Sequence, residues 1–419
     1  GGVESFLAVE GVLRVPIPSR RDPRLQLPLP VTRRNQILTT PLLHIIQTTR
    51  IMGISTEVPQ TVEWAGKRVP IYPMETVDFG RVLSQEPAEL ETLLRVCQQS
   101  GFFYLDLDSL DGQRFLEDQQ QTLKLMHRYF DHPIEEKNEL GLVTAHLGYE
   151  PVGSRTGGLP NTRDGYEMFK VSRDEIQRRD PKFPVILQND TDKKVLRNAI
   201  SGSNIVTKAL LSGLSSAMGL AGAARFENAH RNDRPSTSTL AMMHYVPSDP
   251  TKDTQIGHQK HTDISSLTLL FAEEWGLQIR PPGTKEFGFV APKPGHAIVN
   301  VGDSLRFASG HTFMSCIHRV VPFRPDEHRY SIAYFLRAEN DTMFTDSEGR
   351  YVTAGQWHDE KFFLFKATPD VQALAPPSML YGGMSADEEW TPYAQEKARA
   401  NVEEAQKEPL VKEAMVKAH

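Results

Sequence analysis

Hydrophobic and polar residues follow two different periods along this chain, and the period changes near Asp233. Before that point, apolar residues recur at the spacing of an amphipathic helix. In segment 87–101 this spacing runs from Leu90 to Cys97, and Gly101 is typical of a helix C-terminus. Further helices are expected at 112–131 and 192–220.

Short extended segments lie between these helices. Strands are predicted at 69–79 and 102–107, where apolar runs stand beside turn-forming residues. A loop rich in glycine, proline and threonine covers 148–163, and an extended segment follows at 165–175. The first half of the chain is therefore expected to form a helix-rich support.

After Asp233 the pattern becomes a series of short β-rich runs, separated by Gly, Pro and Asp and without helical patterns between them. Runs spaced this closely predict an antiparallel sandwich or barrel. The predicted strands are 236–246, 265–273, 275–282, 287–293, 296–303, 314–322 and 329–336. A short helix at 354–367 and a charged helical tail from about 388 follow. The expected fold class is mainly β with flanking helices (α+β).

Segment 1–51 differs from the rest because it carries several arginines and prolines and no sustained period. The chain begins with Gly-Gly, whereas Met52 opens a stretch that continues into the patterned region. We hypothesise that Met52 is the native start and that 1–51 is an added leader. An organelle transit peptide would also be rich in arginine, but Glu4, Glu10 and Asp22 argue against one because such peptides are poor in acidic residues.

These patterns divide the chain into four regions. The leader at 1–51 is followed by a helix-rich support region at 66–190. One helix and the β-rich core occupy 191–340, and C-terminal helices with a tail occupy 341–419. The residues with recognisable chemistry are concentrated in the third region.

Composition and charge exclude several classes of protein. With 39% apolar and 24% charged residues, the chain is typical of a globular protein, and no stretch approaches the roughly 18 uninterrupted apolar residues of a membrane-spanning helix. Cys97 and Cys316 are too few for a disulfide framework, which favours a reducing, cytoplasmic location. A net charge of −6 without a Lys/Arg cluster argues against a nucleic-acid partner. A small molecule is the expected partner, and the oligomeric state stays open.

The sequence His261-Thr262-Asp263 offers two metal ligands at alternate positions. Side chains alternate along a strand, so His261 and Asp263 would project from one face. His318 follows in another strand-like run and can join them if the strands close into a barrel. Two imidazoles and one carboxylate form the facial triad of non-haem iron(II) oxygenases, which leaves metal positions open for ligands.

Simpler explanations of this pair exist. Among 14 histidines, a histidine two residues before an aspartate is by itself more often an ordinary surface or core residue than a ligand. A structural zinc site would use similar side chains, but such sites are normally four-coordinate and rich in cysteine. Cys316 has no second thiolate near it in sequence, so zinc is the weaker assignment.

A second pair of polar residues favours iron. Arg329 and Ser331 are again two residues apart on a predicted strand, shortly after His318. A guanidinium binds a carboxylate through two parallel hydrogen bonds, and a neighbouring hydroxyl adds another. Arg329 and Ser331 are therefore interpreted as a carboxylate clamp.

The order of these motifs resembles the isopenicillin N synthase-like branch of the iron(II)/2-oxoglutarate oxygenases. The resemblance extends to the segments SGFFYLDL, LAMMHYVP, AIVNVGDSLRFASGHTFMSCIHRVV and RYSIAYFL, and it covers roughly 69–366. It implies a double-stranded β-helix (jelly-roll) core. It also implies an enzyme that uses Fe(II), 2-oxoglutarate and O2 to oxidise a small organic molecule, with release of succinate and CO2.

The resemblance assigns a role to each motif residue. It implies that His261, Asp263 and His318 hold the iron and form the catalytic centre. It implies further that Arg329 and Ser331 bind the distal carboxylate of 2-oxoglutarate. The iron ligands alone do not select hydroxylation, desaturation or ring formation as the outcome.

Several neighbouring residues carry weaker assignments. The resemblance makes Tyr245 an additional donor to the cosubstrate, although a core tyrosine is an equal alternative. His244 and Val246 depart from many relatives, which carry Asn and Tyr there, so the contact from this strand is in doubt. Asn300 and Asp303 are expected to hold a turn near the barrel rim, since both residue types satisfy local backbone groups.

Two other functions stay open at this point. An oxidase of the isopenicillin N synthase kind would use the triad without 2-oxoglutarate and hold a substrate carboxylate in the clamp. A catalytically silent small-molecule-binding protein would have no need of the triad and clamp, which are all present. The substrate is expected to be a secondary metabolite, bound near the loop 148–163 and side chains such as Met243 or Phe335.

Overall fold

The computed structural model describes residues 60–155, 163–247, 257–280, 282–374 and 377–381. The hypothesised leader at 1–51 and the predicted tail from 388 lie outside these residues. No helix within the described part of the chain is both long and apolar enough to cross a membrane.

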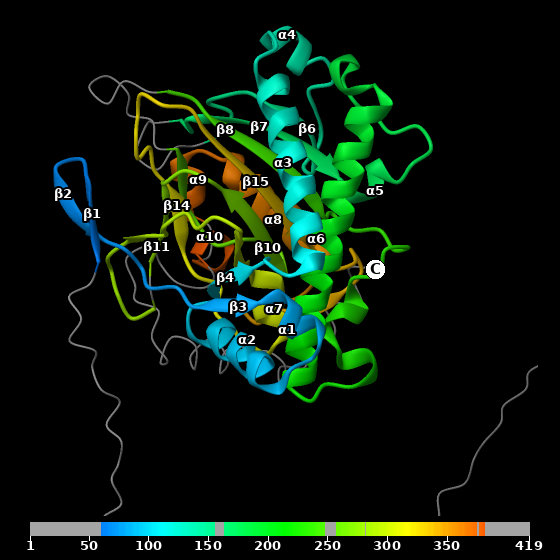
Figure 1. Cartoon of the computed structure of the whole chain (residues 1–419), viewed down its shortest axis with the longest axis vertical. Coiled ribbons are helices and arrows are strands. Elements are labelled where there is room, and N and C mark those ends of the chain that lie inside the picture. The colour runs from blue at the N-terminus through cyan, green and yellow to red at the C-terminus, as the bar shows by residue number, and fades with distance from the viewer. Residues whose placement is uncertain (1–59, 156–162, 248–256, 281, 375–376, 382–419) are drawn as a thin grey trace, which may run out of the picture. The chain divides into compact units, whose positions relative to one another are not determined.

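Two β-sheets carry the fold (Figure 1). The nine-stranded sheet contains, in spatial order, β3 (Thr76–Asp78), β4 (Phe102–Asp106), β13 (His296–Val301), β10 (Leu267–Ala272), β15 (Arg329–Leu336), β8 (Thr239–Tyr245), β7 (Tyr166–Ser172), β6 (Leu147–Glu150) and β5 (Leu142–Thr144). The four-stranded sheet contains β12 (Gly288–Phe289), β11 (Leu277–Ile279), β14 (His318–Val320) and β9 (His258–His261). Two hairpins lie apart from both sheets, β1 (Thr61–Trp64) with β2 (Lys67–Pro70) and β16 (Met343–Thr345) with β17 (Tyr351–Thr353). Apart from the parallel pair β3 and β4, all strand pairs are antiparallel, so the predicted mainly β class is confirmed.

Alternation along the central strands separates two cores. On β8, Leu240 and Met242 belong to the core under the helices, whereas Met243 belongs to the core between the two sheets. Strand β15 repeats this pattern, with Tyr334 facing the helices and Ala333 facing the inter-sheet core. Because side chains of a strand point alternately to its two faces, each central strand contributes to both cores.

The two longest helices of the described structure cover the outer face of the nine-stranded sheet. Figure 1 shows α3 (Leu110–Phe130) and α6 (Asp190–Ala217) side by side along it. Helix α6 is continuous through Gly202, where a Cβ atom would lie 2.6 Å from the ring of Phe115 on α3. The glycine therefore allows the two helices to approach, and it does not break the helix.

Shorter helices complete the structure. They are α1 (Phe79–Leu83), α2 (Pro87–Gln99), α4 (Ile134–Lys137), α5 (Arg173–Ile176), α7 (Asp303–Ala308), α8 (Ala354–Lys366), α9 (Pro369–Leu374) and α10 (Pro377–Tyr381). A third apolar cluster joins the C-terminal helices to the core through Trp357 and Phe365 on α8 and Ile264, next to the metal motif. The C-terminal region thus packs directly on the predicted site.

Three local predictions differ from the structure. The strand predicted at 69–79 is interrupted, and only its ends lie in β2 and β3. The predicted loop at 148–163 begins within β6, where Gly148 has a φ of +114° and a Cβ would lie 2.3 Å from a backbone oxygen. Gly148 therefore allows a close approach to the backbone of Gly141 and does not form a turn. Helix α7 was not predicted, because six residues are too few to show a helical period.

Candidate metal centre

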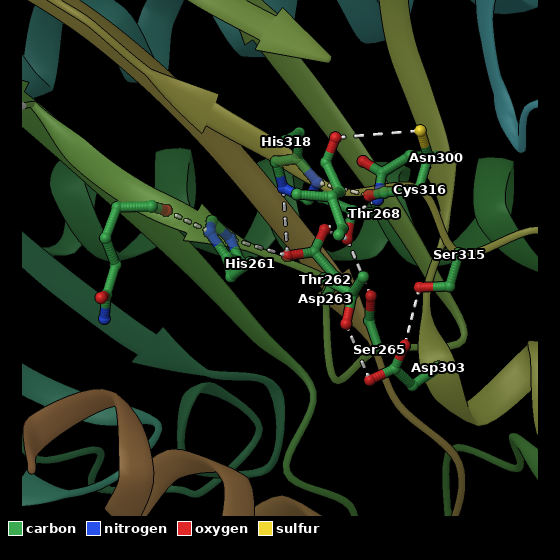
Figure 2. Close-up of polar contacts among 12 residues, drawn as sticks. His261, Thr262, Asp263, Ser265, Thr268, Asn300, Asp303, Ser315, Cys316 and His318 are labelled. Carbon is green, nitrogen blue, oxygen red and sulfur yellow. Dashed lines mark hydrogen bonds and ion pairs between the residues drawn. The ribbon is translucent and has the colours of Figure 1, made fainter. Parts of the chain in front are cut away.

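The structure brings the three predicted metal ligands together (Figure 2). His261 ends β9 and His318 begins β14, and the two residues are register partners in the four-stranded sheet. Their Nε2 atoms lie 3.4 Å and 3.5 Å from Oδ1 of Asp263. All three side chains are buried, and their ligand atoms lie within 4.8 Å of one another. Asp263 itself lies two residues beyond the end of β9, so the expectation that His261 and Asp263 alternate along one strand is wrong, although the two side chains still converge.

Both imidazoles are oriented by backbone carbonyl groups. Nδ1 of His261 donates to the carbonyl oxygen of Gln259 at 2.7 Å, and Nδ1 of His318 donates to that of Cys316 at 3.1 Å. A carbonyl oxygen can only accept, so each Nδ1 carries the proton and each Nε2 keeps its lone pair. The two lone pairs and Asp263 Oδ1 therefore converge as a three-donor set for a divalent ion.

The electrostatics of the triad favour an ionised carboxylate. Burial alone would raise the pKa of Asp263, but the adjacent His318 and His261 imidazoles hold it well below its usual range. Burial lowers the pKa of His261. For His318 the effect of burial is outweighed by Asp263, which raises the pKa of the imidazole. A buried carboxylate that stays charged is a strong ligand for a hard cation.

The second oxygen of Asp263 is held by two donors. Thr268 Oγ1 donates to Oδ2 at 2.6 Å, and Asn300 Nδ2 donates to the same atom at 2.8 Å. Oδ1 is thereby left to face the imidazoles. The expectation that Asn300 holds a turn near the rim is wrong, because this residue lies in β13 and its side chain is buried against the metal motif.

A buried ion pair supports the backbone of the motif from the other side. Asp303, the first residue of α7, pairs with Lys361 of α8, and both side chains are fully buried. Thr262 and Ser315 also donate to Asp303, at 3.1 Å and 2.7 Å. The backbone N–H of Asp303 donates to the carbonyl oxygen of Asp263 at 2.8 Å. Asp303 is therefore part of the buried framework of the triad and not a rim residue.

The structure also brings the three predicted clamp residues together. Arg329 and Ser331 lie on the inner face of β15, and Tyr245 on β8 is the register partner of Arg329. The guanidinium of Arg329 stacks over the Tyr245 ring at 4.8 Å, and its Nε donates to the carbonyl oxygen of Trp275 at 3.0 Å. Burial raises the pKa of Tyr245, and the neighbouring Arg329 and Ser331 oppose that rise.

Two polar atoms of the clamp are open for a ligand. Nη1 of Arg329 and Oγ of Ser331 are buried and have no hydrogen-bond partner among the described residues. Unpartnered buried polar groups are costly, so such a pair fits a site that is completed by a bound carboxylate. Tyr245 contacts Met243, which lines the cavity beside the triad, with 3.9 Å between Oη and Sδ.

The cavity beside the triad contains cations that the sequence patterns did not reveal. His261 and Asp263 line it together with Arg155, Lys170 and Arg337. The cavity encloses about 520 Å³, part of it open to solvent. Met243 and Phe335, predicted as candidate pocket residues, also line it. A signal for one cation was present in the sequence, because the alternation of β15 continues two residues beyond Phe335 to Arg337.

Two family models match this chain. The model of the 2OG-Fe(II) oxygenase superfamily matches residues 237–338, which contain the triad and the clamp. The model described as the N-terminal region of non-haem dioxygenases in morphine synthesis matches residues 74–189. The two matches cover most of the described structure between β3 and β15.

Curated relatives cover most of the same region. The chain is 43% identical over 319 residues to oxidoreductase vrtI of Penicillium aethiopicum, a match that spans 75% of this chain and 76% of the relative. It is 39% identical over 317 residues to the 2-oxoglutarate-dependent dioxygenase frbH of Dothideomycetidae sp., spanning 75% of this chain and 96% of the relative.

A solved structure supports the fold at lower identity. A full-length protein of Neurospora crassa, crystallised in complex with alpha-KG and thymine, superposes with a TM-score of 0.58 at 21% identity. The match covers 72% of this chain and 98% of the Neurospora protein. Together with the superfamily match, it identifies the two packed sheets as the expected double-stranded β-helix core.

Proposed function

This chain belongs to the 2-oxoglutarate–Fe(II) oxygenase superfamily, an enzyme family that uses Fe(II), 2-oxoglutarate and O2, and we propose that His261, Asp263 and His318 hold its iron. The observation that carries this assignment is the convergence of two imidazole Nε2 atoms on Asp263 Oδ1 at 3.4 Å and 3.5 Å. Each Nδ1 already donates a hydrogen bond to a backbone carbonyl oxygen, so in the neutral ring the lone pair of Nε2 is available for a metal ion. Three protein ligands on one side leave the opposite side free for the cosubstrate, as this chemistry requires.

The proposed cosubstrate site is the clamp. Arg329 would pair with the distal carboxylate of 2-oxoglutarate through its open Nη1, and Ser331 would add a hydrogen bond through its open Oγ. Tyr245 would limit the position of the guanidinium through the stacked contact at 4.8 Å. The unpartnered atoms support this assignment because they account for polar groups that are otherwise buried without compensation.

When bound by His261, Asp263 and His318, Fe(II) with 2-oxoglutarate would supply the O2 activation needed to oxidise a C–H group, with conversion of the cosubstrate to succinate and CO2. The protein groups orient the reactants and exclude water. Thr268 and Asn300 fix the carboxylate of Asp263 before any ligand arrives. The apolar core between the sheets packs beside the site, and exclusion of water from that side would protect reactive species from side reactions.

The proposed substrate is a small organic molecule of the secondary-metabolite class. The two relatives described above, from Penicillium aethiopicum and Dothideomycetidae sp., are called oxidoreductase and 2-oxoglutarate-dependent dioxygenase. The modest size of the cavity beside the triad also supports a small substrate. We further propose a cytoplasmic location, since Cys97 and Cys316 are both buried free thiols.

The central experiment separates metal binding from cosubstrate binding. Calorimetry with Mn(II), followed by 2-oxoglutarate, is applied to the wild type, to Asp263→Ala and to Arg329→Met. Asp263→Ala is expected to lose Mn(II) affinity, whereas Arg329→Met is expected to keep it and lose 2-oxoglutarate affinity. Asp341→Ala is the matched control, because this carboxylate is 66% exposed and pairs with Arg234 on the surface.

Turnover then tests the reaction itself. Succinate is expected to form in proportion to the oxidised product when the wild type is incubated with Fe(II), 2-oxoglutarate and a fungal metabolite extract, and not with Asp263→Ala. Comparison of the metabolites in the two incubations identifies the substrate. Unchanged Mn(II) affinity in Asp263→Ala, or product formation without 2-oxoglutarate, would contradict the assignment.

A further inference from the structure

We propose that the cavity beside the triad binds a carboxylate group of the substrate, with Arg337 as its main partner and Lys170 as a second. This inference rests on the proposed function, because it places the substrate next to the metal ligands. The resulting substrate class is a small acid with an apolar body. The clamp at Arg329 belongs to the cosubstrate and is a separate site.

The two arginines are placed by one strand. Residues 329, 331, 333 and 335 of β15 face the space between the sheets, and Arg337 continues this alternation just beyond the strand end. A strand advances about 3.3 Å per residue, so eight residues place Arg337 roughly 26 Å along the backbone from Arg329. The guanidinium groups of Arg329 and Arg337 therefore lie in different regions of the protein. A single small molecule would not bind to both.

Arg337 is buried without a carboxylate partner among the described residues. Its residue exposure is 9%, and Nη1 donates to the backbone oxygen of Thr237. Nε has no hydrogen-bond partner in the described part of the chain. Burial lowers the pKa of Arg337 to about 10, which reflects an incompletely compensated charge. A buried cation normally has an anionic partner, so a ligand that supplies one fits this position.

The other cations of the cavity exceed the available carboxylates. Lys170 and Arg155 both pair with Glu150, which Lys366 also approaches at 3.3 Å. Glu150 is thus shared by three cations, and none of these ion pairs includes Arg337. Among the described lining residues the only carboxylate is Asp263, which is assigned to the metal. The cavity therefore carries a positive excess.

Two histidines near Arg337 also retain open polar atoms. Nδ1 of His146 and Nε2 of His358 are buried without a described partner. Burial, reinforced by Arg337, lowers the pKa of His146 to about 4 and that of His358 to about 2. Both rings are therefore neutral near pH 7, so they do not compete with Arg337 for an anion.

Thr239, His258 and a set of apolar side chains complete the lining, and the larger apolar side chains form part of the wall. These are Met168, Met243, Ile264, Phe335, Phe362 and Phe365. The ring of Phe362 lies 4.7 Å from Lys170 Nζ and 5.3 Å from the Arg155 guanidinium, so the apolar wall and the cations are adjacent. A carboxylate attached to an aromatic or aliphatic body would satisfy both parts of the cavity.

The test compares acids with their neutral amides. Protein loaded with Ni(II) and saturating 2-oxoglutarate, which fills the clamp without turnover, is titrated calorimetrically with four pairs: benzoate, phenylacetate, 3-phenylpropanoate and octanoate against the corresponding amides. At least one acid is expected to bind about tenfold or more tightly than its amide, as expected for a charge-assisted hydrogen bond. Arg337→Gln should abolish this preference, and Arg337→Lys should retain part of it.

Controls separate the possible causes. Arg95→Gln removes an arginine on the surface, 43% exposed and paired with the exposed Glu75, and should leave the acid preference unchanged. Lys170→Met should weaken acid binding less than Arg337→Gln and serves as a second variant if Arg337→Gln does not fold. Equal binding of acids and amides by the wild type, no binding of any probe, or an unchanged preference in both folded variants would overturn the inference. Failure of the wild-type protein to bind Ni(II) or 2-oxoglutarate in the loading step would instead contradict the proposed function.

Discussion

Replacing Thr268 by valine tests whether the buried donors around Asp263 prepare the metal centre. Valine has nearly the shape of threonine but lacks the hydroxyl that donates to Asp263 Oδ2 at 2.6 Å. The hydrogen bond from Asn300 would remain at 2.8 Å. The carboxylate of Asp263 would therefore keep one of its two donors and could rotate about this remaining hydrogen bond. The variant is expected to bind metal more weakly without losing the ligands themselves.

The magnitude follows from the role of these donors. Loss of a group that orients a metal ligand typically weakens metal affinity by about 10- to 100-fold. This corresponds to about 1.4–2.7 kcal/mol of binding free energy. Loss of a buried hydrogen bond to a charged group should also lower the free energy of unfolding of the metal-free protein, by about 1.5–3 kcal/mol.

The assay is Mn(II) titration monitored by competition with a chelating dye, combined with urea unfolding of the metal-free protein. Thr268→Ser keeps the hydroxyl and is the matched control, so its metal affinity should stay within a few-fold of the wild type. Metal affinity in Thr268→Val that equals the wild-type value would refute the reasoning. Equal losses in Thr268→Val and Thr268→Ser would show that packing of the methyl group, and not the hydroxyl, is responsible.

Three further predictions concern the ion pair, the clamp and the cavity. Lys361→Met should lower the free energy of unfolding by about 3–5 kcal/mol, because Asp303 would stay buried without its cation. In urea unfolding, the loss of stability in the double variant Lys361→Met/Asp303→Asn should be smaller than the sum of the losses in the two single variants. Ser331→Ala should raise the Kd of 2-oxoglutarate about tenfold and leave Mn(II) affinity unchanged in calorimetry, since only the clamp loses a donor to a charged group. Burial, opposed by Glu150 and reinforced by Arg155, lowers the pKa of Lys170 to about 7. Between pH 7 and 9, Lys170 would stay protonated in the unfolded chain but lose its proton in the folded protein. The free energy of unfolding of the wild type, relative to Lys170→Met, should therefore rise with pH. A difference in the free energy of unfolding that falls over this pH range would contradict the lowered pKa of Lys170.

Most of the proposed ligand residues could be predicted from the sequence because they lie in strands with a period of two, whereas Asp263 lies beyond the end of β9. His261, His318, Arg329 and Ser331 lie in strands β9, β14 and β15, and alternation alone predicts that Arg329 and Ser331 share a face. The mainly β class followed from the same regular spacing. Closure of the two sheets, which brings His261 opposite His318, is a long-range event that the resemblance supplied and the spacing did not.

The groups that hold the ligands in place were not predictable in the same way. Asn300 is separated from Asp263 in sequence by the three strands β10, β11 and β12, and nothing in its neighbouring residues indicates a buried amide. Its position on β13 becomes clear only from pairing with β10, where Asn300 is the register partner of Thr268. Two donors to one carboxylate oxygen thus come from a cross-strand pair, and only the register reveals it.

The C-terminal helix α8 extends the metal centre beyond the segment that the oxygenase model matches, which ends at residue 338. Lys361 of this helix neutralises Asp303, and Asp303 in turn binds both Thr262 and the backbone of Asp263. Phe365, one turn later, lies edge-on to the His261 ring at 5.4 Å and lines the cavity. One helix therefore fixes the backbone of the motif and forms a wall of the substrate cavity. Because the ion pair is fully buried, we expect a change in the position of α8 to affect both the proposed metal ligands and the proposed substrate cavity.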